Sequence, residues 1–400
     1  MEHKAAPLQK KFFTPGVLVM LAFMAAGAIA IAARFIGGIG YVSNLTNARP
    51  WGLWVGVDVA TGVALAAGGF TTAALAHIWG RHHYEPITRP ALLTAMLGYT
   101  FVVLGLLVDI GRSWAIWKPM VYWNPNSVLF EVAMCVMIYL NVLYIEFIPV
   151  VAEQFKGKVN LPGPLAFLNR LLDRLLALAD AVLGKAMWVF VILGVVLSCM
   201  HQSSLGSLML VAPTKIHPLW YSPLLPLFFL TSAMAVGYPM VVFETTLATT
   251  SFQLDSEMEI LTPLTRITVF LLGSYMVLKL GDMALRGTYR YLFDGTFQTN
   301  AFIIEMLFGV IIPFAMLVSQ RVRQSRKALF TAASLIVGGV VLNRINVFIV
   351  AYSPPLAENR YFPAPGEIFV TLGLIATLMF LYRLLVTWLP VLQKTREVAS

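Results

Sequence analysis

Long apolar runs alternate with short polar connections along the whole chain. A helix needs about 20 mostly apolar residues to cross the hydrocarbon core of a bilayer. Ten runs approach or exceed that length, and they cover residues 16–36, 53–78, 91–111, 127–152, 185–201, 222–249, 263–285, 301–319, 328–350 and 366–389. The pattern predicts an all-α, polytopic membrane protein with ten transmembrane helices, in which residues 1–400 form a single integral membrane domain.

The composition excludes the main alternatives. Hydrophobic residues make up 59% of the 400 residues and charged residues 12%, whereas soluble globular proteins carry roughly 25% charged residues. A water-soluble enzyme and a disordered chain are therefore excluded. Cys135 and Cys199 lie inside apolar runs, which favours inert thiols over a disulfide. The net charge of +9 does not indicate nucleic acid, because membrane proteins collect Lys and Arg in cytoplasmic loops.

The distribution of Lys and Arg predicts the orientation. Sixteen of them lie in the two tails and in the connections on the same side, whereas seven lie in the connections of the opposite side. Cytoplasmic loops carry the excess of basic residues. We therefore expect a multi-pass protein with both termini in the cytoplasm.

The longest connection covers residues 153–184 and contains the segment LNRLLDRLLALADAVLG. Leu and Ala recur there at helical spacing, interrupted by Arg170, Asp173 and Arg174. An amphipathic helix on the cytoplasmic membrane surface accounts for this pattern. A plain helical linker accounts for it equally well.

Ionisable residues inside the spans are distributed unevenly. Such groups cost several kcal/mol each in a membrane and are functional candidates. Those near the outer ends of their spans are Asp58, Asp109, Glu131, Lys279, Asp282, Glu305 and Arg344, with Arg34, Arg112, His201 and Glu367 at the same level. Glu146, Glu244, Arg266 and Arg383 lie toward the cytoplasmic ends. The distribution predicts a polar cavity in the outer half of the membrane with a thinner polar path inward.

Several of these charges have simpler explanations. Arg34, Arg266 and Arg383 lie near helix ends, where snorkelling to the interface accounts for them. Lys279 and Asp282 are three residues apart and could form a local ion pair. Glu131 is harder to explain structurally, because it lies between Phe130 and Val132 with no basic residue nearby in sequence.

The histidines argue against haem. A membrane b-type haem usually needs two imidazoles from helices at matching depth. The six histidines are His3, His77, His82, His83, His201 and His217, and of these His201 and His217 alone share an outer level. No motif for a metal, an iron–sulfur cluster or a nucleotide occurs. We expect no haem, no metal site and no redox cofactor belonging to this chain.

Six ordered motifs point to a family. They are PWGLWVGVD at 50–58, DIGRSW at 109–114, NPNSVLFE at 124–131, MHQSSLGSLM at 200–209, HPLW at 217–220 and YFP at 361–363. From about residue 30 to residue 388 the chain resembles the NrfD and polysulfide-reductase membrane-subunit family, and within it the membrane subunit of hydrogenase-2-type nickel–iron hydrogenases. The connection 153–184 and both tails show the least resemblance.

The resemblance implies an architecture and an activity. Family members contain two four-helix bundles plus two extra helices, react with menaquinone and dock a ferredoxin-like iron–sulfur subunit on the outer face. In the hydrogenase branch, electrons from the small and large hydrogenase subunits reach the quinone pool of the bacterial cytoplasmic (inner) membrane. The family generally lacks haem. We expect the outer loops 37–52, 112–126, 202–221 and 286–300 to form the dock.

Quinone reduction takes two electrons and two protons, so its site needs proton donors and hydrogen bonds to the carbonyl groups. On the matching motifs, the resemblance implies catalytic roles for Glu131, Asp109 and His201. The expected quinone-binding residues are Asp58, Asp109, Arg112, Glu131, His201 and Ser204. The expected proton path comprises Glu131, Glu146, Glu244 and Arg344, with proton translocation as a hypothesis.

Two other functions stay open at this point. A secondary transporter would also use buried charges, but near the bilayer centre. A non-catalytic anchor for a periplasmic enzyme would need neither Glu131 nor Asp109. Bound menaquinone would distinguish the quinone-reactive function from both alternatives.

Overall fold

The computed structural model describes residues 5–8, 11–160, 163–255, 257–355 and 360–392, apart from the side chains of Pro164 and Leu165. Within these ranges the chain forms helices and no β-strand, and ten helical spans are long and apolar enough to cross a membrane. The all-α, ten-span prediction is therefore confirmed. Four basic residues used to predict the orientation, Lys4, Lys10, Lys394 and Arg396, lie outside the described residues.

The spans agree closely with the apolar runs. They are Pro15–Gly37, Trp54–Ile78, His82–Asp109, Val128–Phe155, Ala166–Val211, Leu225–Phe252, Met258–Leu285, Phe297–Val318, Arg326–Val350 and Pro365–Trp388. Their long helices are α1 (Pro15–Gly37), α5 (Glu85–Asp109), α6 (Val128–Phe155), α7 (Asn169–Ser207), α8 (Leu225–Phe252), α9 (Met258–Leu285), α13 (Arg326–Ile345) and α14 (Pro365–Trp388). Short helices α2 (Ile39–Val42) and α12 (Gln320–Gln324) lie in connections.

Three of the described spans contain π-helical turns. The second combines π-helix Trp54–Thr61, α3 (Gly62–Leu65), α4 (Ala67–Ala73) and π-helix Ala74–Ile78. The eighth combines α10 (Phe297–Met306), π-helix Leu307–Ile311 and α11 (Ile312–Val318), and the ninth ends in π-helix Asn346–Val350. π-Helical turns are rare and frequently occur at functional sites. Asp58 and Asn346 both lie in such turns.

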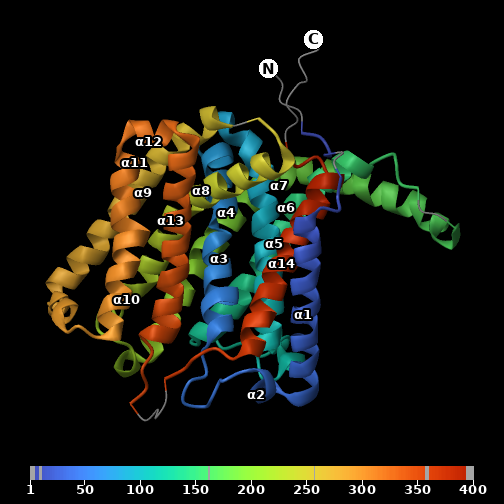
Figure 1. The fold of residues 1–400 in the computed structure, drawn as a ribbon. Coiled ribbons are helices and arrows are strands. Elements are labelled where there is room, and N and C mark those ends of the chain that lie inside the picture. The colour runs from blue at the N-terminus through green and yellow to red at the C-terminus, as the bar shows by residue number, and fades with distance from the viewer. Residues whose placement is uncertain (1–4, 9–10, 161–162, 256, 356–359, 393–400) are drawn as a thin grey trace.

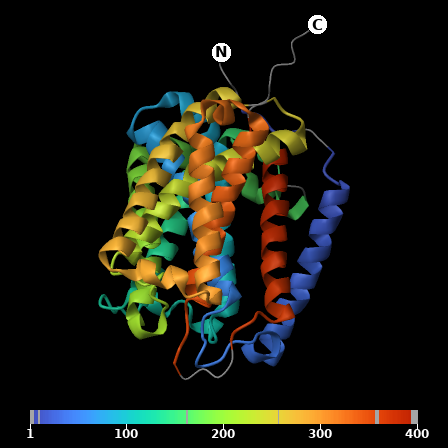
Figure 2. The ribbon, with the colours of Figure 1, turned by 60° about the vertical axis from the view of Figure 1, so that its left-hand side comes forward.

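The helices pack as two bundles and a pair. The second span, α5, α6 and α7 form the first bundle, whereas α8, α9, the eighth span and α13 form the second. The bundles meet along α4, α7 and α8. Helices α1 and α14 pack against each other at the side of the first bundle, through α14 and α5 (Figures 1 and 2). Two four-helix bundles plus two extra helices were expected, and they are observed.

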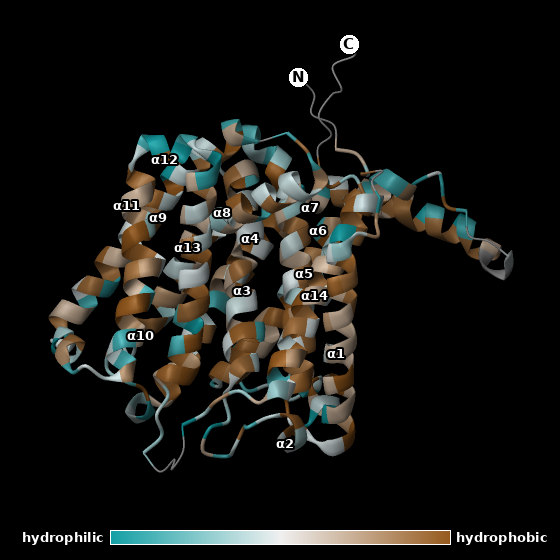
Figure 3. Cartoon of the chain, in the orientation of Figure 1, coloured by the Kyte–Doolittle hydropathy of each residue, from teal (hydrophilic) through white to brown (hydrophobic). Residues whose placement is uncertain are grey.

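Apolar residues occupy the middle of the bundle and polar residues gather at its two ends (Figure 3). The first and last described segments of the chain meet at one end of the bundle. There the Ala6 amide donates to the Leu392 carbonyl at 3.1 Å. An even number of spans separates them, in agreement with termini on one side of the membrane. The connections 37–54, 109–128, 207–225 and 285–297, and the described residues 350–355 and 360–365, lie at the opposite end, which is called the outer end below.

The connection 153–184 and the fifth span share a single helix. Helix α7 begins at Asn169 and continues without a break into the first bundle. Its N-terminal part projects sideways from the bundle (Figure 1). Asp180 pairs with Lys156 at 2.7 Å, which ties the projecting part to the end of α6. An exposed apolar stripe, Leu171, Leu175, Leu178 and Val182, runs along it, and the membrane-surface location of this amphipathic helix stays a prediction.

At two helix crossings, a pair of facing glycines lets the two helices approach each other very closely. An added Cβ at Gly27 on α1 would lie 2.7 Å from the Cα of Gly373 on α14. In the second bundle, a Cβ at Gly339 on α13 would lie 2.2 Å from the Cα of Gly309. Small residues let membrane helices approach through their backbones. Both contacts therefore depend on the absence of a side chain.

Gly339→Ala is expected to destabilise the chain. The new methyl group meets backbone that cannot move aside without separating α13 from the eighth span, and overpacking of this kind costs about 1–3 kcal/mol. Unfolding in mixed micelles measures the change. The matched control is Gly338→Ala, because a Cβ there meets nothing within 4 Å. Equal stability of the two variants would contradict a role for the glycine contact.

Candidate functional site

A cavity of about 390 Å³ lies between α1, the second span, α5, α8 and α14. Its walls are mostly aliphatic and aromatic, and its polar groups come from the two ends. The apolar lining includes Met20, Val57, Leu65, Phe101, Phe243, Leu247, Phe252, Leu374, Leu378 and Met379. Small-molecule sites are typically cavities of this kind, with few polar groups that fix the orientation of the ligand.

Asp58 supplies the carboxyl group at the outer part of the cavity. It lies in the π-helical turn of the second span, four residues from the start of that turn. The Thr371 hydroxyl of α14 donates to Asp58 Oδ2 at 2.7 Å. Gly105 on α5 allows close approach, since a Cβ there would lie 3.0 Å from the Asp58 Cβ. Three helices therefore position this carboxyl group.

Asp109 lies close to Asp58 at the outer end of the first bundle. Its Oδ1 atom is buried and has no hydrogen-bond partner among the described residues. Arg34 was expected to snorkel, but it is 5% exposed and donates to the Val108 and Ile110 carbonyls at 2.6 Å each. The C-terminal carbonyls of α5 lack helical partners, so Arg34 satisfies them and places a positive charge near Asp109.

Glu367 completes the outer group of carboxyl side chains. It accepts hydrogen bonds from the Ala364 amide at 2.7 Å, the Asn44 amide at 3.1 Å and the Tyr361 hydroxyl. Its charge acts on Asp109. These bonds join the start of α14 to the connection after α2. The YFP motif therefore contributes Tyr361 to the assembly of the outer end.

Glu244 supplies the carboxyl group toward the inner end of the same cavity. Thr94 of α5 and Tyr382 of α14 line the cavity with it. Glu244 Oε1 and both hydroxyl oxygens are buried, and the two hydroxyl groups lie close enough to Glu244 to interact with its carboxyl group. The inner end of the cavity therefore holds a carboxyl group with two hydroxyl groups beside it. Asp58 and Glu244, predicted for different roles, face one cavity.

Other predicted residues form a polar column between α6 and α7. Ser204 donates to Glu131 Oε1 at 2.6 Å near the outer end. Deeper, His201 Nδ1 and the Tyr99 hydroxyl are 3.2 Å apart, and the Tyr99 and Tyr139 rings meet edge to face. The structure therefore brings Glu131, Ser204 and His201 to one helix interface.

Glu146 continues the column toward the inner end. It lies 15 residues after Glu131 on α6, and its buried Oε1 has no partner among the described groups. A Cβ at Gly194 would lie 2.9 Å from that oxygen, so the glycine leaves room for the carboxyl group. The column lies on the α6–α7 side of the first bundle. None of these residues lines the cavity described above.

Glu131 and Arg112 differ from what the sequence suggested. Apolar neighbours were expected to shield Glu131, but this residue is exposed at the outer end of α6, and one of its carboxyl oxygens accepts from the buried Ser204. Arg112 is exposed in the connection between α5 and α6, and no hydrogen bond or ion pair joins it to Asp109 in the described structure. Partner or lipid atoms can therefore reach both groups.

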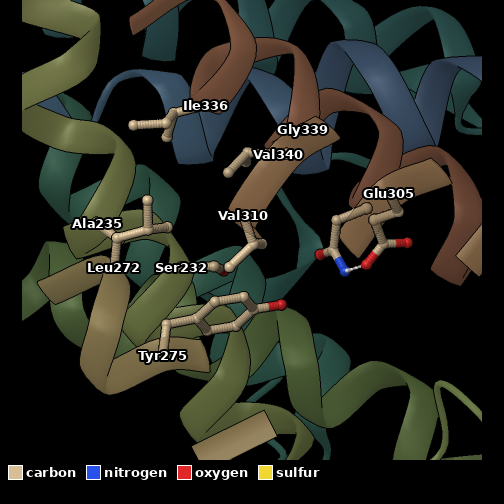
Figure 4. Close-up of a pocket in the computed structure, with 11 residues that line it drawn as sticks. Ser232, Ala235, Leu272, Tyr275, Glu305, Val310, Ile336, Gly339 and Val340 are labelled. Atoms are coloured by element: carbon tan, nitrogen blue, oxygen red, sulfur yellow. Dashed lines mark hydrogen bonds between the residues drawn. The ribbon is translucent and has the colours of Figure 1, made fainter. Parts of the chain in front are cut away.

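The second bundle holds a separate polar cluster. Glu305 accepts hydrogen bonds from Asn343 Nδ2 at 2.7 Å, Asn346 Nδ2 at 2.7 Å and Trp220 Nε1 at 2.9 Å. Arg344, expected on the proton path, is fully buried here and donates to Asn343 Oδ1, Ser232 Oγ and the Phe229 carbonyl. The Tyr275 hydroxyl points toward Glu305 across a small cavity (Figure 4). Arg344 thus belongs to a different bundle from Glu131 and Glu146.

The sequence analysis identified most of the buried charged residues, but it missed many of the polar residues that contact them. The missed residues that contact predicted ones or line the same cavity are Thr94, Tyr99, Tyr139, Asn343, Asn346, Thr371 and Tyr382. Threonine and tyrosine are common on apolar helices, so a scan for charge passes over them. Buried polar groups need hydrogen-bond partners, which would have prompted a search for hydroxyl residues at matching depth.

Comparison with known proteins gives one family match and several relatives. Residues 41–354 match the family described as "Polysulphide reductase, NrfD". The chain is 37% identical to a protein of Nitratidesulfovibrio vulgaris Hildenborough, over 98% of this chain and 97% of the relative. It is 32% identical to the probable Ni/Fe-hydrogenase 2 b-type cytochrome subunit of Escherichia coli K12, over 99% and 97%. It is 26% identical to the menaquinone reductase integral membrane subunit of N. vulgaris Hildenborough, over 90% and 87%.

The comparison corrects one prediction. The sequence was read as excluding haem, but the E. coli relative is named a b-type cytochrome subunit, which implies haem. The prediction rested on a search for two imidazoles at one depth, whereas haem iron is also held by one histidine, or by histidine with methionine. Among the described residues, His201 places a buried imidazole inside the spans, and its Nε2 has no hydrogen-bond partner. Among the described histidines, His201 is the one that fits such a ligand.

Proposed function

Since the chain belongs to the polysulphide reductase NrfD family, whose members include membrane subunits of respiratory oxidoreductases, we propose that it is the quinone-reactive subunit of such a complex. It passes electrons between an extracytoplasmic iron–sulfur subunit and menaquinone. The hydrogenase and menaquinone reductase names of two relatives support a hydrogenase partner and this quinone. The small and large hydrogenase subunits complete the proposed complex.

The cavity between α5, α8 and α14 is the observation that carries the proposal. An isoprenoid quinone is a long apolar molecule with two carbonyl oxygens, so it suits apolar walls with polar groups at the ends. The quinone ring is assigned to the outer part, where Asp58 lies close to the outer connections that dock the electron donor. The isoprenoid tail lies against residues such as Leu247, Phe252 and Leu378.

The side chains supply protons and hydrogen bonds, and the electrons come from the partner. Reduction of the quinone to the quinol consumes two electrons and two protons, which must reach its two oxygens. Asp58 bonds one carbonyl, and Asp109 exchanges protons with it at the outer end. The α6–α7 column of Glu131, His201 and Glu146 is a second proton-conducting candidate. Should the chain bind haem, His201 Nε2 would be the ligand, and the haem would supply a one-electron step.

Photoaffinity labelling tests the proposal. The full chain in nanodiscs is irradiated with an azido-menaquinone, and the labelled peptides are identified by mass spectrometry. Labels are expected on the cavity segments of α5, α8 and α14, and unlabelled menaquinone should compete for them. Labels confined to exposed positions outside the cavity, such as Trp188, without competition, would contradict the proposal.

Glu131→Gln is expected to slow electron transfer to menaquinone by about 100-fold, the usual contribution of a positioned acid or base. Glutamine keeps the hydrogen bond from Ser204 but cannot carry the proton. Assembly with the partner should be unchanged, and quinone-dependent turnover of the isolated complex measures the effect. Glu153→Gln is the matched control, because Glu153 lies on the same helix and pairs with Arg89 at the inner surface. A wild-type rate for Glu131→Gln would assign Glu131 a structural role.

The proposed location is the bacterial cytoplasmic membrane, with both termini in the cytoplasm. The excess of Lys and Arg on the side of the termini supports this orientation. Reporter fusions after Ser400 and within residues 112–126 should report opposite sides of the membrane. Identical results for the two fusions would overturn the orientation.

A further inference from the structure

Lys279 is a buried cation without a polar partner. It lies on α9 in the second bundle and is 2% exposed. Its Nζ atom lies 4.8 Å from the centre of the Phe228 ring and 5.8 Å from that of Phe302. In the described structure it forms no hydrogen bond or ion pair. An ammonium group has three donors, and leaving them unsatisfied inside a membrane is costly.

The nearby carboxylates are already satisfied by other groups. Asp282 was expected to pair with Lys279, but it binds Arg286 at 2.7 Å and accepts from Ser222 at 3.0 Å. Glu305 accepts its three hydrogen bonds from Trp220, Asn343 and Asn346. The charges facing Lys279 are therefore those of Glu305, Asp282 and Arg286. None of them takes up its donors.

The charges of this cluster do not balance while Lys279 is protonated. Asp282 and Arg286 neutralise each other, and Glu305 remains to compensate both Lys279 and Arg344. One positive charge is then in excess in a buried site, where the Phe228 and Phe302 rings lie beside Lys279 and the Phe229 ring lies beside Arg344. Loss of one proton from Lys279 removes that excess. Binding of the proton is supported in turn by the aromatic rings and the Glu305 charge.

We propose that Lys279 is a proton-exchanging group of the second bundle, separate from the quinone cavity. The amine takes up one proton to become ammonium and returns the same proton, and no electron moves. Arg286, which is 24% exposed in its side chain, connects the cluster to the outer surface. A cavity of about 20 Å³ beside Glu305, Tyr275 and Ser232 has room for one water (Figure 4).

This proposal gives the second bundle a role that the quinone site does not explain. The residues lining the quinone cavity come from α1, the second span, α5, α8 and α14, and Lys279 and Glu305 are not among them. A proton held there lies in the outer half of the membrane. The site is therefore positioned to exchange protons with the outer side whether or not quinone is bound.

Nitrogen NMR of the full chain in lipid, with ¹⁵N at lysine Nζ, tests the proposal without any partner or quinone. The other described lysines, Lys11, Lys118, Lys156, Lys158, Lys185, Lys215 and Lys327, are exposed. A water-soluble paramagnetic ion should quench their signals and spare that of Lys279. The spared signal should change from ammonium to amine between about pH 5 and about pH 9, where exposed lysines stay protonated.

Two variants test whether the spared signal belongs to Lys279 and whether Glu305 affects its protonation. Lys279→Arg should remove the spared signal and change quinone turnover by less than two-fold, which separates this site from the quinone site. Glu305→Gln removes the facing negative charge, so the amine should appear at lower pH. An ammonium signal at every pH would overturn the proposal, even if both variants failed to fold. A spared ammonium signal that moves when chloride is replaced by gluconate would overturn it in favour of a bound anion.

Discussion

Leu378→Trp is expected to lower quinone-dependent turnover by about 100-fold, equivalent to about 2.7 kcal/mol of lost binding. Leu378 lies on α14 and lines the cavity assigned to menaquinone. The larger indole ring fills space that the quinone needs and leaves both acidic ends unchanged. Turnover of the complex isolated with its native partners measures the effect, and extraction of bound menaquinone shows whether occupancy falls with it.

The matched control is Leu372→Trp. Leu372 lies on the same helix, is 37% exposed and does not line the cavity. The Leu372→Trp variant should retain wild-type turnover and a wild-type amount of bound menaquinone. An equal loss in both variants would indicate that a Trp on α14 disturbs the packing against α1. Full activity of Leu378→Trp would move the quinone site elsewhere in the molecule.

The spans were predictable because the bilayer sets one dominant requirement, a long apolar helix with its backbone groups satisfied internally. The fifth span shows where that requirement stops being informative. Arg170, Asp173 and Arg174 interrupt the apolar run, but they do not interrupt the helix, since arginine is a good helix former. Hydropathy therefore gave the apolar run 185–201 and a separate helical connection before it, whereas α7 joins the two in one helix from Asn169 to Ser207.

The sequence predicted how deep each ionisable residue lies in the membrane, but it did not predict toward which side of its helix each side chain points. The sequence placed Asp58 and Asp109 at one level, and they are electrostatic neighbours. It also placed Glu131 at that level, but Glu131 is an exposed residue of α6 that binds Ser204 of α7 and does not line the cavity. The π-helical turn at Trp54–Thr61 shifts the register of the second span. A constant helical period cannot show which side of such a helix faces a cavity.

Hydrogen-bonded pairs that are far apart in the sequence could not be predicted for the same reason. Arg34 binds the Ile110 carbonyl across 76 positions, and Thr371 binds Asp58 across 313. Arg34 lies on α1 and Thr371 on α14, so both pairs depend on how these two helices pack against the first bundle. One chain without tertiary contacts cannot show that packing, so Arg34 was interpreted as an interfacial residue. The haem prediction failed similarly, because a count of histidines tests one type of ligation.

Glu305→Leu is expected to lower the free energy of unfolding by about 3–5 kcal/mol, the cost of breaking a buried charged network by removing one partner. The substitution leaves the Trp220, Asn343 and Asn346 donors without their acceptor. Lys279 and Arg344 also lose the carboxylate that compensates them. Unfolding in mixed micelles measures the change, and Glu259→Leu, at an exposed position on α9, should have little effect.

Removing the excess cation as well should restore part of the loss. In the double variant Glu305→Leu with Lys279→Met, the unpaired amine is gone, and methionine suits the space between the Phe228 and Phe302 rings. The two substitutions should therefore destabilise less together than the sum of their separate effects, with a coupling of about 0.5–3 kcal/mol. Strict additivity of the two changes in unfolding free energy would mean that Lys279 and Glu305 do not interact. The cluster would then be a hydrogen-bonded scaffold around Glu305 alone, with Lys279 solvated independently of it.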